Sequence, residues 1–189
     1  MNTVPIVDGT AAEITSAIDQ IANCATNHLS RLSSVRLLKF ELWLPEGVRD
    51  EENRLFQAFA ESFRQFLAYD GLFPFCLWRR EQVGNRRRYL CAWFLGDFSS
   101  PLVNGYFKVA ATIWQKTLGF RKDKGEIRWP QGNPYGQPMA NGTKIKEGWS
   151  DDLQVTAICN QWLAEMRRCA SQVQDPHRVL QTFGAVHQY

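Results

Sequence analysis

The chain has 189 residues, a formal net charge of +3 and 44% hydrophobic residues. This length fits a single domain with one substantial core, and an aromatic content of 13% argues against intrinsic disorder. No stretch approaches the roughly 18 apolar residues that a membrane span needs, and the N-terminus lacks the pattern of a signal peptide. We therefore expect a cytoplasmic protein that has no membrane partner and forms one domain over residues 1–189.

Charge is unevenly distributed along the chain. Residues 1–72 carry 6 Lys and Arg against 10 Asp and Glu, whereas residues 73–189 carry 16 against 9. The basic second part favours an anionic partner, either nucleic acid or an acidic protein surface, although solvated surface arginine is an equally good explanation. The five cysteines are odd in number and form no CxxC pair. They predict reduced thiols and no zinc site, and we expect no cofactor.

Helical and strand patterns alternate in the first part of the chain. A capping box at Thr10–Glu13, followed by apolar residues at helical spacing, predicts a helix over 11–31. Strict alternation of apolar and polar residues predicts a strand over 35–44. Asp50 is the expected cap of a second helix over 51–68. The apolar stripe of this helix consists of Leu55, Phe59, Phe63 and Phe66.

A hairpin is predicted in the middle of the chain. Two apolar runs flank a polar turn and indicate antiparallel strands over 74–80 and 87–95. If the hairpin is symmetric about its turn, Cys76 faces Cys91 across it.

The remaining elements complete an α+β domain. A third helix is predicted over 101–118, and residues 120–149 form a long loop in which only 126–129 resembles a strand. A last helix is expected over 151–173, and a short strand over 182–186. Helices packed on a central, mainly antiparallel sheet define the α+β class.

Seven segments of the chain share their order and spacing with a known family. They are Ser33–Leu42, Phe75–Glu81, Leu95–Gly96, Ile113–Gly119, Trp129–Tyr135, Gln161–Glu165 and Thr182–Gly184. Together they resemble the YagK/YfjJ C-terminal-domain family, inovirus-type replication initiators of the HUH endonuclease class. The resemblance implies an HUH/RRM-like fold and a protein of a mobile genetic element, a phage or a plasmid.

The resemblance also implies where catalytic residues would lie. Family members carry a His-hydrophobe-His pair after the hairpin turn, which holds a divalent cation, and a nucleophilic Tyr on the late helix. The matching positions here are Arg87–Tyr89 and Trp162, and an indole offers no nucleophilic oxygen. The three histidines, His28, His177 and His187, do not pair at ligand spacing. We therefore expect a pseudoenzyme with no catalytic residue and no bound metal.

An alternative role for Tyr89 is a catalytic one. As a relocated nucleophile it would make the chain an active nickase with rearranged residues. No metal ligand or general base lies near it in the sequence. A packing role on the hairpin is therefore the expected one.

Basic residues gather around the predicted hairpin turn. They are Arg79, Arg80, Arg86, Arg87 and Arg88, interleaved with Trp78 and Tyr89. Arginine next to aromatic residues can grip phosphates and stack on bases, so the hairpin is the first candidate binding surface. The alternative is a solvated hairpin tip that discourages edge-to-edge aggregation. A weaker basic group in the long loop comprises Arg121, Lys122, Lys124, Arg128, Lys144 and Lys146.

Two functions from different classes fit this sequence, and both act by binding. In the first, the protein inhibits or regulates a host protein or nucleoprotein complex, and an anti-CRISPR-like activity is one concrete form. In the second, it is a nucleic-acid-binding accessory factor in phage or plasmid replication control. Loss of both catalytic elements on a retained sequence pattern favours the first, because it suggests reuse of the old binding face. The sequence carries no signal for an oligomeric state.

Overall fold

The computed structural model describes residues 11–96, 103–119, 125–128, 144–147, 152–172 and 183–187. These residues form α1 (Ala11–Leu29), β1 (Ser34–Trp43), α2 (Arg54–Tyr69), β2 (Phe73–Val83), β3 (Arg86–Gly96), α3 (Val103–Thr117), β4 (Glu126–Arg128), β5 (Lys144–Glu147), α4 (Asp152–Gln172) and β6 (Phe183–His187). All four predicted helices are present, with ends within about three residues of those expected. In the described part of the chain, no helix is long and apolar enough to cross a membrane.

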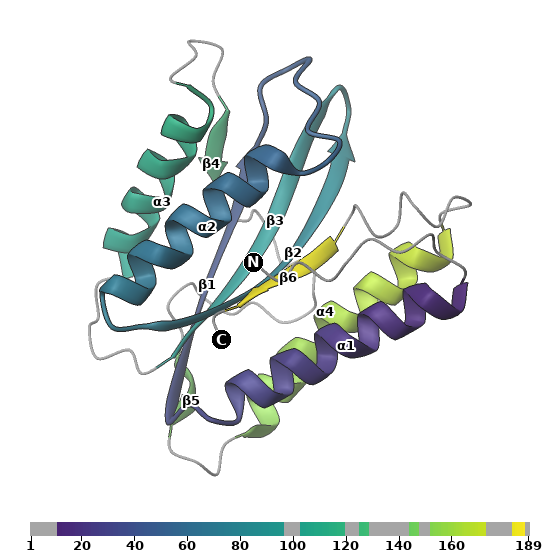
Figure 1. Ribbon diagram of the computed structural model, residues 1–189, viewed down its shortest axis with the longest axis vertical. Coiled ribbons are helices and arrows are strands. Elements are labelled where there is room, and N and C mark those ends of the chain that lie inside the picture. The colour runs from purple at the N-terminus through teal and green to yellow at the C-terminus, as the bar shows by residue number, and fades with distance from the viewer. Residues whose placement is uncertain are drawn as a thin grey trace.

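The strands form one sheet in which all the pairs are antiparallel. Their order is β4-β1-β3-β2-β6, and β5 pairs with β1 at the end opposite to β4. Helices α2 and α3 lie on one side of the sheet, whereas α1 and α4 lie side by side on the other (Figure 1). The predicted α+β class, with a central antiparallel sheet and packed helices, is confirmed.

Side chains of β1 alternate between two cores, one on each face of the sheet. Leu38, Phe40 and Leu42 belong to the core with α2 and α3, whereas Val35 and Leu37 belong to the core with α1 and α4. Successive side chains of a strand point to opposite faces, so the alternation read from the sequence becomes a two-sided strand. A strand buried on both faces must have helices on both sides of its sheet.

Helix α2 supplies the aromatic centre of its core. Its buried residues are Phe56, Phe59, Ala60, Phe63 and Leu67, which follow the spacing of one helical face. The ring of Phe63 meets Trp93 of β3 edge-on, with 5.0 Å between ring centres. Two members of the predicted stripe, Leu55 and Phe66, lie half-buried at the margins of this face. The buried face of α2 is therefore rotated slightly relative to the predicted apolar stripe.

The turn between β2 and β3 consists of Gly84 and Asn85. Gly84 has φ of +60°, which a type II′ turn requires at its first position and which glycine adopts without strain. This turn is centred one residue later than a symmetric reading of the sequence suggests. Cys76 therefore lies opposite Trp93, and the prediction that it faces Cys91 is wrong.

The predicted long loop over 120–149 contributes two strands to the sheet. β4 matches the short strand expected at 126–129, whereas β5 was not predicted. β5 pairs with residues 34–36 of β1, so it extends the outer edge of the sheet. The predicted terminal strand is also present, as β6 beside β2.

The described cysteines that form no disulfide differ in burial. Cys24 is half-buried, whereas Cys76, Cys91 and Cys159 are buried. Burial raises the pKa of the Cys159 thiol to about 12, so it presents almost no thiolate near neutral pH. We expect iodoacetamide at pH 8 to label Cys24 first, and the buried thiols only after unfolding. Peptide mass mapping measures this order, and labelling of Cys159 as fast as Cys24 in the folded protein would contradict it.

Candidate binding surface

The sheet face that α1 and α4 cover is apolar over only part of its length. Leu77, Leu90 and Ala92 belong to the core with these helices. Nearer the hairpin turn, the residues on the same face are charged. We call this area the charged platform, and it consists of Lys39, Glu41 and Trp43 of β1, Arg79 and Glu81 of β2, Arg86 and Arg88 of β3, Glu126 and Arg128 of β4, and Glu165 and Arg168 of α4.

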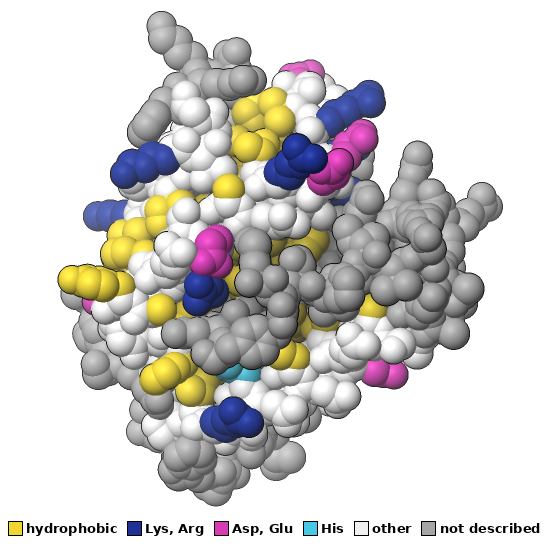
Figure 2. Space-filling model, viewed as in Figure 1, with side chains coloured by type: hydrophobic (Ala, Val, Ile, Leu, Met, Phe, Trp, Pro, Cys, Tyr) yellow, Lys and Arg dark blue, Asp and Glu magenta, His cyan; other side chains and the backbone are white. Residues whose placement is uncertain are grey.

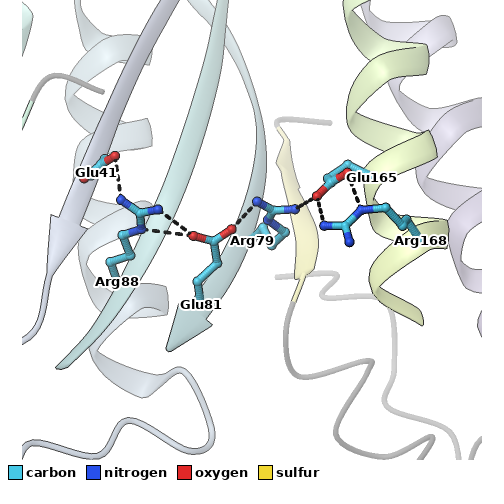
Figure 3. Close-up of polar contacts among 6 residues, drawn as sticks. All are labelled: Glu41, Arg79, Glu81, Arg88, Glu165 and Arg168. Carbon is cyan, nitrogen blue, oxygen red and sulfur yellow. Dashed lines mark hydrogen bonds and ion pairs between the residues drawn. The ribbon is translucent and has the colours of Figure 1, made fainter. Parts of the chain in front are cut away.

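A continuous series of ion pairs crosses the platform from β1 to α4 (Figure 3). At its β1 end, Arg88 Nη1 donates to Glu41 Oε1 at 2.9 Å. The same guanidinium donates through Nε and Nη2 to Glu81 Oε2, at 3.0 and 2.8 Å. Arg88 therefore joins carboxylates from the strands on both sides of β3, which are β1 and β2.

The series continues through a buried arginine to helix α4. The side chain of Arg79 is 6% exposed and pairs with Glu81 on its own strand. Its Nη1 also donates to Glu165 Oε1 at 2.5 Å, and Arg168 Nε donates to Glu165 Oε2 at 2.9 Å. Hydrogen bonds from Arg168 and Arg79 together lower the pKa of Glu165 to about 2. Glu165 is therefore a fixed anion that ties α4 to the sheet.

Trp43 is the centre of a group of three guanidinium groups, which we call the Trp43 arginine cluster. The guanidinium carbons of Arg86, Arg88 and Arg128 lie 5.1, 5.3 and 4.9 Å from the centre of the indole. These distances are within the range of cation–π attraction. The indole Nε1 donates to Glu41 Oε2 at 2.8 Å, so the ring is also held at its edge.

Glu126 on the edge strand β4 balances part of this cluster. It accepts from Arg86 Nη1 at 2.8 Å and from Arg128 Nε at 2.8 Å. The hydrogen bond from Arg128 is the main cause that holds the pKa of Glu126 below its usual range. Arg88 also pairs with Glu81, so the three arginines of the Trp43 arginine cluster contact three carboxylates. The charged platform as a whole, with six Lys and Arg against four Glu, carries a net positive charge.

The other two hairpin arginines lie on the opposite sheet face, towards α2. Arg80 Nη1 donates to the carbonyl oxygen of Asp50 at 2.5 Å and to Asn53 Oδ1 at 2.9 Å. Arg87 Nε donates to Gln82 Oε1 at 3.1 Å. Arg80 therefore holds the segment before α2, and the five hairpin arginines do not form one surface.

The two aromatic candidates of the hairpin are core residues. Tyr89 is fully buried and Trp78 nearly so, and both pack against Phe56 of α2, with 4.6 and 4.7 Å between ring centres. Their ring faces are covered, so they cannot stack on bases. The prediction that Trp78 and Tyr89 are binding residues is therefore wrong, whereas the packing role expected for Tyr89 agrees with its place in the core.

The positions matched to the family's metal pair and nucleophile lie on opposite faces of the sheet. Tyr89 belongs to the core with α2 and α3, and Arg87 shares its face, whereas Trp162 belongs to the core with α1 and α4. A metal and a nucleophile acting on one phosphate must share a face. The β3 residues on the side of Trp162 are Arg86, Arg88 and Leu90.

Sequence reasoning located arginines of the platform but missed the side chains that balance them. Glu41, Glu81 and Glu165 were not candidates, and neither was Trp43. Glu41 and Trp43 alternate along β1 with the buried residues Phe40 and Leu42. This alternation places both side chains on one face of the strand and could have identified them as candidates. The loop candidates Arg121, Lys122 and Lys124 lie outside the described residues.

Within the described ranges, no group of three His, Cys, Asp or Glu side chains is arranged to hold a metal ion. None of the family models, curated proteins or solved structures compared with the chain matches it.

The low pKa of Glu165 predicts how stability depends on pH. A carboxylate whose pKa is lower in the folded state stabilises the fold above its unfolded pKa of about 4.3, and this contribution is lost as the pH falls towards 2. We expect Glu165→Gln to be less stable than the parent at pH 7, with a difference that shrinks between pH 5 and pH 3. Urea unfolding at each pH measures it, and a constant difference would contradict the low pKa.

Proposed function

We propose that the protein is a catalytically inactive, replication-initiator-like protein that acts by binding. In this proposal it works in the cytoplasm as an inhibitor or regulator of a protein or nucleoprotein complex of its host, and an anti-CRISPR-like activity is one form. The observation that carries the proposal is the charged platform. Ion pairs occupy the sheet face beside α4, on which an initiator would need its metal ligands and nucleophile.

The order of the elements supports the fold named in this proposal. β1, α2, β2, β3, α3 and β4 follow one another as a β-α-β-β-α-β unit whose strands have the order β4-β1-β3-β2. This split βαβ arrangement is the one used by RRM-like domains. In such a domain both helices pack on one face, as α2 and α3 do here, and the other face is available for function.

The chemistry of the platform supports binding over cleavage. On the α4 side of β3, Arg86 and Arg88 stand at alternate positions, the spacing that a metal-binding pair of imidazoles on this face would need. Guanidinium groups stay protonated and do not ligate cations. The helix opposite offers Trp162, which has no nucleophilic oxygen, and Glu165, which two arginines engage.

The second candidate function is a nucleic-acid-binding accessory factor in replication control. The net positive charge of the charged platform favours it. Salt-sensitive binding of DNA by the isolated protein would be its signature, because phosphate contacts release counterions.

An affinity capture from lysate of the host cells separates the two functions. The bait is the tagged full chain, with and without nuclease treatment of the lysate. A matched pair of variants accompanies it: Arg86→Ala with Arg128→Ala in the platform, and Arg54→Ala with Arg167→Ala as an equal loss of exposed charge elsewhere. We expect a discrete protein partner that resists nuclease and is lost only with the platform variant. Loss of all captured protein after nuclease treatment, together with salt-sensitive DNA binding by the isolated protein, would instead favour the accessory-factor function.

A further inference from the structure

The Trp43 arginine cluster has donors that the described structure does not use. Arg86 donates through Nε and Nη1, and Arg128 through Nε and Nη2. In the described part of the chain, no hydrogen bond uses Arg86 Nη2 or Arg128 Nη1. The side chain of Arg128 is 44% exposed and that of Arg86 is 24% exposed, so an external acceptor can reach them.

These donors are held in position before any ligand arrives. Cation–π contacts keep the guanidinium groups of Arg86 and Arg128 about 5 Å from the ring centre of Trp43. The indole is itself fixed by its hydrogen bond to Glu41. A partner therefore loses little side-chain freedom of the protein on binding, which favours affinity. Planar guanidinium groups with paired donors match the geometry of carboxylates and phosphates.

The signs of the neighbouring charges discriminate between these two kinds of acceptor. Next to the cluster, Glu41 and Glu81 alternate with arginines at hydrogen-bond distance. A nucleic-acid strand carries its negative charges in a fixed, regular row along the backbone, so it would meet these carboxylates together with the arginines. Glutamate carboxylates stand on flexible side chains, which can turn towards the arginines and away from the carboxylates. A protein segment can offer carboxylates to the cluster and uncharged or basic groups to the rest. On the face shown in Figure 2, the Lys and Arg side chains of the described residues are likewise spread out and do not form one continuous basic area.

We propose that the Trp43 arginine cluster binds carboxylate side chains of an acidic segment of a protein partner. This inference rests on the proposed function and specifies its partner: a protein that presents clustered Asp or Glu, and not a phosphodiester backbone. Arg86 and Arg128 supply the donors, and Trp43 keeps both guanidinium groups in place.

The test compares two labelled probes of similar negative charge, hexaglutamate and a hexathymidylate oligonucleotide. Fluorescence anisotropy is measured with the full chain at about 50 mM salt, where charge interactions are weakly screened. We expect hexaglutamate to bind several-fold more tightly than hexathymidylate. Arg86→Ala with Arg128→Ala should weaken hexaglutamate binding about tenfold through loss of two charge-assisted contacts, whereas Arg54→Ala with Arg167→Ala should change it less than twofold.

A single charge reversal provides a second test in case the double variant fails to fold. Arg128→Glu changes only an exposed residue of the edge strand and should weaken hexaglutamate binding at least as much. Equal or tighter binding of hexathymidylate, no binding of hexaglutamate, or equal losses in the platform and control pairs would each overturn the inference. None of these results restores cleavage chemistry, so the absence of catalysis is tested separately.

Discussion

Replacing Arg79 with alanine is expected to lower the free energy of unfolding by about 3 kcal/mol, because it removes the buried partner of two carboxylates. The Arg79 side chain is 6% exposed and joins Glu81 to Glu165 of α4. Without it, both carboxylates keep one arginine each, Arg88 and Arg168, which places the effect at the lower end for a broken buried ion pair. Urea unfolding followed by circular dichroism measures the change.

Arg54→Ala is the matched control for this prediction. Arg54 also pairs with a glutamate, Glu52, but its side chain is 79% exposed. An exposed pair contributes little, so we expect a loss below about 0.5 kcal/mol. Glu165→Gln should cost less in the Arg79→Ala background than in the parent, because Glu165 has by then lost one of its two arginines. If Arg79→Ala costs no more than Arg54→Ala, the ion pairs between sheet and helix do not hold α4 in place.

Replacing Asp50 with alanine is the second large effect, a loss of about 2 to 3 kcal/mol. The Asp50 carboxylate accepts from the amides of Leu55 and Phe56, both at 3.1 Å, and from the hydroxyl of Tyr89 at 2.8 Å. Its removal leaves two amides of the first turn of α2 and one buried phenol without this acceptor. Burial, reinforced by the Asp50 charge, raises the pKa of Tyr89, so the phenol remains a proton donor at ordinary pH.

A double-mutant cycle with Tyr89→Phe isolates the part of this effect that connects α2 to the hairpin. Tyr89→Phe alone should cost about 1 kcal/mol, since it removes the hydroxyl that contacts Asp50 Oδ2 and Asn53 Oδ1 and leaves the ring in place. Asp50→Ala should then cost less in the Tyr89→Phe background than in the parent. Strict additivity of the two changes would show that the hydroxyl and the carboxylate do not interact.

Elements with strong local patterns could be predicted from the sequence. The alternation around Phe40 indicated β1, and Asp50 was identified as a cap because an acidic residue before an apolar helical pattern is a local signal. Asp50 acts from three residues before Asn53, the residue that precedes α2. The cap residue could be predicted, but not the backbone path that brings its side chain to the helix.

Features that depend on distant residues could not be predicted. β5 has the polar sequence Lys-Ile-Lys-Glu, and it becomes a strand only because the outer edge of β1 is available for pairing. The hairpin register required the choice between two turns around Gly84, and the type II′ geometry decides it. Shifting the turn by one residue moves every cross-strand pair by two positions, so it changes the residue that each arginine faces but not the sheet face that the arginine occupies.

Only part of the candidate site could be predicted from the sequence, for the same reason. A run of arginines near a turn is a local pattern, and three of the five meet on the charged platform. Glu81 lies within the hairpin, but the other partners are far away in the chain, since Glu165 lies 86 positions from Arg79 and Glu41 lies 47 from Arg88. A cluster that looked uncompensated in the sequence is thus largely balanced by carboxylates.

We propose that this protein binds a partner and does not cut DNA. The most direct test incubates the purified full chain with single-stranded DNA and added manganese or magnesium, beside an active nickase as a positive control. Denaturing electrophoresis then detects cut strands, and intact-mass analysis detects covalent protein–DNA adducts. We expect uncut DNA and a protein of unchanged mass. A metal-dependent cut with DNA attached to a tyrosine of this chain would contradict it.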